Sequence, residues 1–179
     1  NKEFASMFGL TVSPENYLVS DTVTEVFAPI RTWEPVGKKK NAIHGILADS
    51  LAALSTNLEM EDEDGDKMGM RRAKEFSEEL RKTCRIITEK NYIMACSNQV
   101  RENIGAKGNM PRFSTPGGVA VGYYASLRLK TSLVEKLKTK KTVAGKEIEK
   151  ITGITIEVEV FKNSVWKPYN KAHVTILFD

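Results

Sequence analysis

Two polar residues follow apolar runs of this sequence, at positions where they could bind a phosphorylated ligand. Asp49 comes near the end of the run AIHGILADS, and Gln99 follows the run YIMACS. Such runs are typical of strands buried in a parallel sheet, and ligands bind in the crevice outside the carboxyl ends of those strands. A carboxylate there can hold the magnesium of a nucleoside triphosphate, and an amide on the next strand can contact the terminal phosphate. Each residue alone is a weak signal. An Asp at the end of a strand, for example, often caps the next helix and binds no ligand.

A long segment without periodicity surrounds the glutamine. Residues 97–118, SNQVRENIGAKGNMPRFSTPGG, show neither a helical nor a strand pattern. Compact domains rarely keep such a segment unless it binds a ligand or is disordered. Its basic residues can contact phosphates, its glycines permit a close backbone approach, and Met110 or Phe113 can wedge between bases. The segment therefore predicts a loop that binds nucleic acid without sequence specificity, with an unliganded flexible lid as the alternative.

Several segments taken together are more specific than any one of them. The chain contains, in order, ILADSLAAL, an acidic loop, MGMRR, SNQVRENIG, TPGG, YYASLRL and VFKN. In order and spacing these segments resemble those of the RecA-type recombinases, over residues 4–178. The chain looks like a divergent member, of the sort that phages and prophages carry. The resemblance implies an α/β, RecA-like core: a mostly parallel sheet flanked by helices, with antiparallel edge strands at the carboxyl-terminal end.

The resemblance also implies roles for single residues. Asp49 resembles the Walker B acid that holds Mg²⁺ through ATP, with Ser50 beside it. Gln99 resembles the glutamine that senses the γ-phosphate and begins the second DNA-binding loop, and Lys162 matches a lysine that reaches the nucleotide of a neighbouring subunit. Residues 57–67 resemble the first DNA loop. The residues implied to bind single-stranded DNA are Arg71 or Arg72, Arg101, Lys107, Arg112, Phe113, Gly117 and Gly118.

One expected motif is missing from this sequence. No G-x-x-x-x-G-K-[ST] loop, which would cradle the phosphates of ATP, occurs in it. We expect that loop to lie before residue 1, so that residues 1–179 form a single domain, the second half of an ATPase core. This part alone would not hydrolyse ATP, whereas the full-length protein would be a DNA-dependent ATPase. The six carboxylates of residues 59–66 would also repel phosphate, so we expect that loop to be a solvated or partner-facing surface.

The elements that must position these residues follow from periodicity and caps. We expect a first helix that ends at Gly9, a second helix that opens at an Asp21 cap, and an amphipathic helix over about residues 68–90. An apolar stripe marks the long helix: Met70, Ala73, Phe76, Leu80, Cys84 and Ile87. Residues 154–161 and 172–178 alternate like strands and predict an antiparallel hairpin.

Composition describes an ordinary globular chain with 41% hydrophobic and 28% charged residues and a net charge of +4. No apolar run approaches the roughly 18 residues of a membrane span, so no membrane partner is expected. Cys84 and Cys96 fall in helix and strand patterns, which indicates buried thiols in a reducing compartment and a cytoplasmic location. Residues 128–150 hold eight basic and three acidic side chains, which fits either an anionic partner or a solvated face. His44 and His173 lack partners at metal-ligand spacing and are expected to be structural.

Three functions fit these observations. The first is an ATP-dependent protein of DNA recombination and repair, which coats single-stranded DNA as a homo-oligomeric filament and promotes strand exchange. The second is a ring ATPase or helicase-type motor with the same Asp and Gln, and the third is a non-catalytic DNA-binding paralogue. The long loop favours the first, because rings generally use shorter pore loops. A glycine-rich G-K-[ST] segment upstream would support an ATPase and count against the paralogue.

Overall fold

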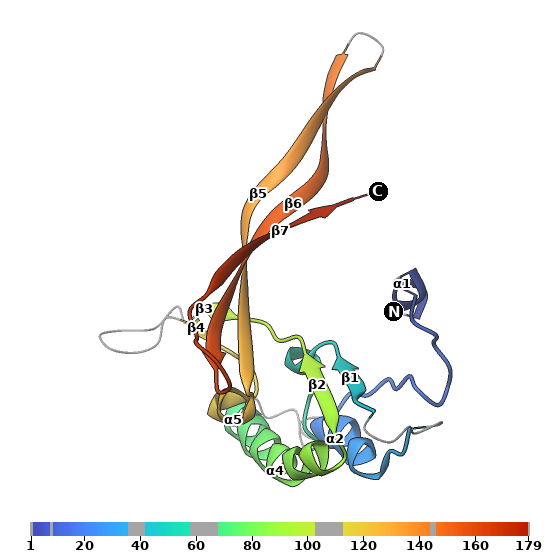
Figure 1. The fold of residues 1–179 in the computed structure, drawn as a ribbon, viewed down its shortest axis with the longest axis vertical. Coiled ribbons are helices and arrows are strands. Elements are labelled where there is room, and N and C mark those ends of the chain that lie inside the picture. The colour runs from blue at the N-terminus through green and yellow to red at the C-terminus, as the bar shows by residue number, and fades with distance from the viewer. Residues whose placement is uncertain are drawn as a thin grey trace, which may run out of the picture. The chain divides into compact units, whose positions relative to one another are not determined.

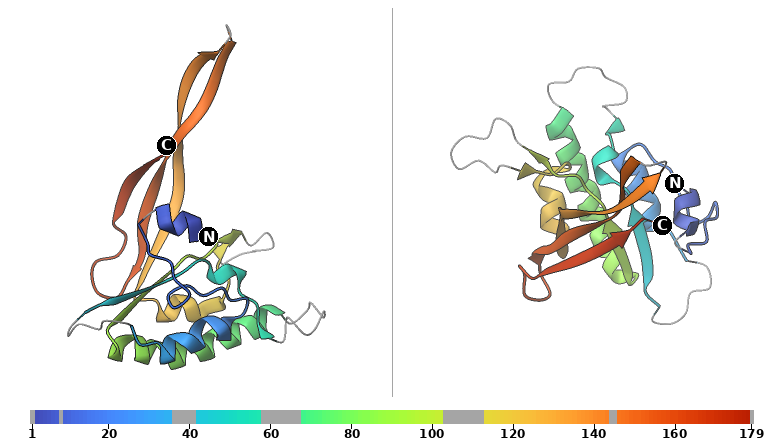
Figure 2. Two further views of the ribbon diagram at one scale, coloured as in Figure 1. Left: turned by 90° about the vertical axis from the view of Figure 1, so that its right-hand side faces the viewer. Right: turned by 90° about the horizontal axis from the view of Figure 1, so that it is seen from above.

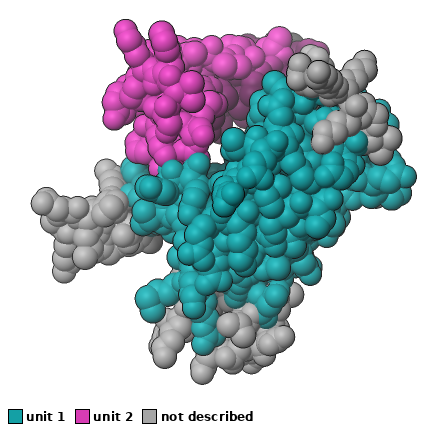
Figure 3. Space-filling view, turned by 60° about the horizontal axis from the view of Figure 1, so that its bottom comes forward, with its two compact units in different colours: residues 1–124 teal, residues 125–179 magenta. Residues whose placement is uncertain are grey.

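The computed structural model describes residues 2–7, 9–35, 42–57, 68–102, 113–143 and 146–178. The chain divides into two compact units, residues 1–124 and residues 125–179 (Figure 3). Each unit is described by itself, and a single domain over residues 1–179 stays a prediction. Among the described helices, none combines the length and apolar composition of a membrane span.

The first unit alternates helices with short strands (Figure 1). Strands β1 and β2 pair in parallel, from His44 opposite Tyr92 to Ala48 opposite Cys96. This pairing confirms the predicted adjacent parallel strands and, with the helices, the α/β class. The elements are α1 (Lys2–Met7), α2 (Val23–Thr32), β1 (His44–Ala48), the 3₁₀ helix η1 (Leu51–Ala53), α4 (Met68–Glu89), β2 (Tyr92–Cys96), β3 (Arg101–Glu102), β4 (Phe113–Ser114) and α5 (Gly118–Tyr124).

Helix α2 begins with a capping box. The Thr22 hydroxyl accepts a hydrogen bond from the Glu25 backbone N–H, and the Glu25 carboxylate accepts one from the Thr22 N–H. The predicted Asp21 cap is therefore wrong by one residue, because the Glu lies three residues after Thr22, the spacing that a reciprocal box requires. The Asp21 N–H also donates to Glu25, so both residues before the helix are held by one carboxylate.

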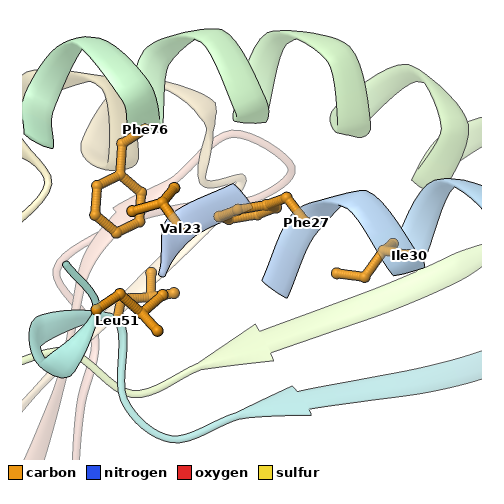
Figure 4. Close-up of a cluster of buried hydrophobic side chains, with 6 residues drawn as sticks. Val23, Phe27, Ile30, Leu51 and Phe76 are labelled. Carbon is orange, nitrogen blue, oxygen red and sulfur yellow. The ribbon is translucent and has the colours of Figure 1, made fainter. Parts of the chain in front are cut away.

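The core of this unit lies between α2, α4 and the strand pair (Figure 4). Phe27 of α2 and Phe76 of α4 are fully buried and meet edge to face, with ring centroids 6.2 Å apart. Ile46 of β1 and Met94 of β2 pack against the same cluster, so the helices cover one face of the strands. The predicted stripe of α4 is confirmed at Phe76, but Met70 is 75% exposed and lies outside the core.

The opposite face of β1 and β2 is exposed in the part of the chain that the structure describes. Leu47 is 72% exposed and Ile93 is 58% exposed. The expectation of fully buried strands is therefore wrong here. Alternate residues of β1 point toward and away from the helices, and only the first set is covered by described side chains.

A charged cluster joins α2 to α4. The Glu79 carboxylate is buried and accepts hydrogen bonds from Arg31 at 2.5 Å and from Lys82 at 2.9 Å. Arg31 also donates to the Thr83 hydroxyl at 3.1 Å. Burial alone would raise the pKa of Glu79, but the hydrogen bonds and charges of Lys82 and Arg31 outweigh it and lower that pKa.

A ring cluster at the start of β1 holds the first histidine. His44 contacts Trp33 and Tyr92 with ring centroids 6.1 and 6.0 Å away, and the Tyr92 hydroxyl donates to the Trp33 carbonyl at 2.7 Å. This packing agrees with the structural role expected for His44. The expectation of buried thiols holds only in part, since Cys84 is half-buried and Cys96 is exposed. Cys96 is the last residue of β2, where the described residues cover the strand only in part.

The second unit is an antiparallel sheet of three strands in the order β5, β6, β7 (Figures 1 and 2). Their bounds are Leu127–Val143, Lys146–Asn163 and Lys171–Leu177. The predicted hairpin is confirmed, with Ile154 opposite Ile176 and Ile156 opposite Val174. Strand β6 extends far beyond the predicted residues 154–161, and β5 and β6 together contain all eight basic residues of the segment 128–150.

Candidate functional site

Asp49 and Ser97 meet at the carboxyl edge of the parallel strand pair. Ala48 lies opposite Cys96, so the next residue of each strand leaves the sheet beside the other. The Ser97 hydroxyl donates a hydrogen bond to Asp49 Oδ1, and the Ser97 N–H donates to the Ala48 carbonyl at 3.0 Å. The Leu51 N–H donates to the Ser97 carbonyl at 3.1 Å. Backbone and side-chain bonds thus hold the Asp49 carboxylate at an exposed edge of the sheet.

Gln99 lies three residues beyond the end of β2, rather than at it. The side chain of Gln99 is exposed, and its N–H donates to the side-chain oxygen of Asn98 at 3.0 Å. The Asn98 side chain in turn donates to the Pro116 carbonyl at 3.1 Å. Asn98 therefore ties the start of the predicted DNA loop to its end. Ser97 and Asn98 were not predicted as site residues, although both belong to the SNQ segment that carried the resemblance.

A short hairpin stem closes the base of the loop. β3 and β4 pair antiparallel, with Arg101 opposite Ser114 and Glu102 opposite Phe113. Arg101 is exposed and Phe113 is 50% exposed, so both predicted DNA-binding residues are accessible on the stem. Lys107 and Arg112 lie outside the described residues, as do residues 58–67 of the predicted first DNA loop.

Two glycines follow the stem at positions where the packing leaves no room for a side chain. Gly117 has φ +87°, and a Cβ atom there would lie 2.6 Å from Val121 Cγ2 and 3.2 Å from the Phe76 ring. Gly118 has φ +67°, and its Cβ would lie 2.8 Å from the Cβ of Ala73. Positive φ and the close approach of α5 to α4 both require glycine here. A contact between these glycines and DNA stays a prediction.

The remaining predicted residues lie on other elements. Ser50 is half-buried next to Asp49, and the peptide between them is cis. Arg71 and Arg72 are half-buried near the start of α4. Lys162 is half-buried in β6, opposite Arg128 of β5, and thus belongs to the second unit.

The donors at the strand edge suit a magnesium ion bound together with phosphates. Mg²⁺ prefers oxygen ligands and is usually held by one or two carboxylates, with substrate phosphates and water completing its shell. Asp49 supplies an exposed carboxylate and Ser97 a hydroxyl that orients it. The described residues contain no group of three His, Cys, Asp or Glu side chains that would hold a metal without such a ligand.

Comparison with known proteins agrees with this geometry. The family model of the RecA N-terminal domain matches residues 7–179. The chain therefore belongs to the RecA N-terminal domain family. The assignment confirms the resemblance inferred from the sequence and the RecA-like α/β fold class. The narrower expectation of a phage or prophage member stays a prediction.

Curated relatives support the same assignment. Protein RecA of Macrococcus caseolyticus is 38% identical over 141 residues, 78% of this chain and 37% of the relative. Protein RecA of Treponema denticola is 37% identical over 141 residues, 78% of this chain and 32% of the relative. Protein RecA of Staphylococcus carnosus is 35% identical over 140 residues, 78% of this chain and 37% of the relative. The chain thus spans about a third of the length of these relatives.

Proposed function

We infer that this protein is an ATP-dependent recombinase that binds single-stranded DNA as a filament and promotes strand exchange. One observation carries the inference: hydrogen bonds link the predicted magnesium carboxylate to the base of the predicted DNA loop. The Ser97 hydroxyl donates to the Asp49 carboxylate, and the side chain of Asn98, the next residue, donates to the Pro116 carbonyl at the far end of the loop. A change at the nucleotide can reach the DNA loop through this short connection.

The nucleotide end of the site consists of Asp49, Ser50 and Gln99. Asp49 would hold Mg²⁺ through ATP, and the exposed Gln99 amide would contact the γ-phosphate. The Gln99 backbone N–H donates a hydrogen bond to the Asn98 side chain. The position of Gln99 is therefore tied to Asn98, the residue whose side chain closes the loop. Lys162 would approach the nucleotide of a neighbouring copy in the filament.

The DNA end of the site consists of the β3–β4 stem and the loop between them. Arg101 supplies a cation and Phe113 an exposed ring on paired strands, and Lys107 and Arg112 add cations by sequence. Phosphate contacts combined with a ring that stacks on or wedges between bases bind single strands with little sequence preference. A recombinase that must act on any sequence needs this kind of contact.

Salt titration of oligonucleotide binding tests the DNA end of the site. Arg101→Ala and Lys107→Ala, each made in the protein as its gene encodes it, should weaken binding of a fluorescent single strand. Each lost phosphate contact should lower the slope of log K against log salt by about 0.7. Lys74→Ala removes an exposed cation of α4 and serves as the matched control, with an unchanged slope. If the loop variants and the control behave alike, the loop does not bind DNA.

A further inference from the structure

The second half of α4 borders a cavity of about 450 Å³ that shares no residue with the candidate site. Cavities of this size commonly hold ligands. We call it the basic cavity, because four of its six lining side chains are cationic and only one is acidic. The lining residues are Arg31, Arg81, Lys82, Arg85, Ile86 and Glu89. This composition favours an anionic occupant.

Arg31 lines the basic cavity from α2, and its guanidinium is already fixed. Its Nη1 donates to the buried Glu79 carboxylate at 2.5 Å and to the Thr83 hydroxyl at 3.1 Å. A guanidinium has five N–H donors, and no other described side chain accepts a hydrogen bond from Arg31. Because the side chain is still 22% exposed, its remaining donors can bind a ligand without further ordering.

The cations on α4 leave positive charge open to solvent. Arg81 is exposed and forms no ion pair with a described residue. Arg85 lies 3.6 Å from Glu89, but the two side chains are 85% and 63% exposed, so this pair contributes little. Lys82 bonds to the buried Glu79 carboxylate. The four cations of the basic cavity thus meet two carboxylates, and the surplus charge is available to an anionic ligand.

The two arginines of α4 have the spacing of carboxylates on an extended peptide. Arg81 and Arg85 lie one turn apart on the same face of the helix, with about 5–6 Å between their Cβ atoms. Every second residue of an extended chain points to the same side, at intervals of about 6.6 Å. Guanidinium forks bind carboxylates through paired hydrogen bonds, and Ile86 adds an apolar contact. An extended segment with alternate acidic residues therefore suits the basic cavity.

The sequence contains such a segment. Residues 59–66, EMEDEDGD, carry six carboxylates and no basic side chain, and Glu59, Glu61 and Glu63 alternate along it. The segment lies outside the described residues. It belongs to the predicted first DNA loop, where its charge would repel phosphate unless cations neutralise it. A basic partner for this segment would remove that conflict.

A neighbouring copy is better placed than the same copy to supply the segment. Arg81 lies 13 residues after Met68, the first residue of α4, which is about 20 Å along the helix axis. Glu63 precedes Met68 by five residues, which span at most about 18 Å when fully extended. The segment of the same copy would therefore have to be almost straight to reach the cavity. In a filament, one surface of each copy meets a different surface of the next copy.

We propose that the basic cavity of one copy binds the acidic segment, residues 59–66, of a neighbouring copy. The inference rests on the proposed function, because the filament supplies the neighbouring copy. Arg81 and Arg85 pair with alternate carboxylates of the segment, and the fixed guanidinium of Arg31 with a third. Neutralised in this way, the segment no longer repels the DNA that the residue 97–118 loop is proposed to bind.

A labelled peptide of residues 57–67 tests whether the cavity recognises the segment. Fluorescence anisotropy measures its binding to the full-length protein without nucleotide or DNA, and circular dichroism checks that each variant is folded. Arg81→Glu reverses the unpaired cation and should bind the peptide roughly tenfold more weakly than the wild type. Lys74→Glu makes the same change of charge on an exposed residue of α4 outside the cavity and should bind like the wild type. A peptide with its six acids replaced by their amides should not bind.

Disulfide cross-linking tests whether the segment comes from another copy. Glu89→Cys introduces a thiol into the cavity lining, and Met60→Cys introduces one into the segment, so all the proposed cations and carboxylates remain. The two variants are mixed with single-stranded DNA and a non-hydrolysable ATP analogue and then oxidised. The mixture should give covalent dimers on a non-reducing gel, and either variant alone should not. A doubly substituted chain that cross-links only within itself would overturn the proposal.

The peptide titration has its own contrary outcomes. Equal losses in Arg81→Glu and Lys74→Glu would overturn the proposal, since general electrostatics would then explain both. So would unchanged peptide binding by Arg81→Glu, and if that variant instead lost affinity for single-stranded DNA, the cavity would be assigned to DNA. Peptide binding requires neither nucleotide nor DNA. A wild type that binds the peptide but no single-stranded DNA would therefore contradict the proposed function and leave the ligand of the cavity established.

Discussion

At the scale of single residues, Ser97 connects the two functions expected at the edge of the sheet. Its hydroxyl donates to Asp49 and its backbone bonds to β1, while Asn98 next to it reaches across the loop to Pro116. A serine at this position orients the carboxylate without adding a charge. In the proposed function, Ser97 is therefore a positioning residue, which would act on magnesium and phosphate through Asp49.

Ser97→Ala should weaken magnesium-dependent nucleotide binding by roughly fivefold, because one hydrogen bond to a carboxylate at an exposed position contributes about 1 kcal/mol. Titration of a fluorescent ATP analogue with and without Mg²⁺ measures the effect. Ser97→Thr keeps the hydroxyl and should restore affinity. Wild-type affinity in Ser97→Ala would show that the hydrogen bond does not orient Asp49 for the nucleotide.

The residue types of the site were partly predictable. Asp49 follows an apolar strand, and this pattern was sufficient to place it at the sheet edge. Ser97 was missed because its partner depends on the register, in which Ala48 lies opposite Cys96. A sequence pattern does not contain that register, and a serine after a strand has no distinctive signal of its own.

At the scale of elements, the glycine pair 117–118 determines how α5 docks on α4. Gly117 is buried against Phe76 and Val121, and Gly118 lies over Ala73. The same glycines end the β3–β4 stem region, so the docking of α5 also fixes where the loop returns to the fold. The sequence suggested only that these glycines let the backbone approach DNA closely. It did not predict their contacts with α4, because the neighbours of a glycine are set by tertiary packing.

Gly117→Ala should destabilise the protein by about 3 kcal/mol, from a positive φ and a clash with Val121 and Phe76. Gly9→Ala is the matched control, because Gly9 has φ +78° but no atom within 4 Å of the added Cβ. It should cost about 1 kcal/mol, from the backbone conformation alone. Urea unfolding of both variants measures the difference. Equal losses would show that the close approach of α5 to α4 contributes nothing.

Helices were easier to predict than the long hairpin. The apolar stripe of α4 and the Glu25 signal of α2 are local patterns, and only the cap residue and Met70 were misplaced. The outer part of this hairpin, residues 138–143 and 146–151, escaped prediction because its described side chains are exposed on both faces. Lys and Glu therefore occupy positions where a half-buried strand would show apolar residues. A ribbon without a buried face lacks the alternation that identifies strands.

At the scale of the whole molecule, the two units carry different parts of the proposed function. Residues 1–124 contain the strand edge, the stem of the DNA loop and the helices that support them. Residues 125–179 contain Lys162 and the β5–β6 hairpin that carries it. Membership of the RecA N-terminal domain family covers both units, since the match spans residues 7–179. In the proposed function, nucleotide bound at the strand edge controls the affinity of the loop for DNA.

Single-stranded DNA binding by Gln99→Ala, measured with and without a non-hydrolysable ATP analogue, tests this control by nucleotide directly. Because Gln99 would contact phosphate rather than DNA, the variant should bind DNA without nucleotide as the wild type does. The enhancement of DNA binding by the analogue should vanish, since the coupling free energy between the two sites passes through this side chain. An enhancement equal to that of the wild type, or an equal loss of affinity with and without the analogue, would show that Gln99 does not couple the nucleotide to DNA binding.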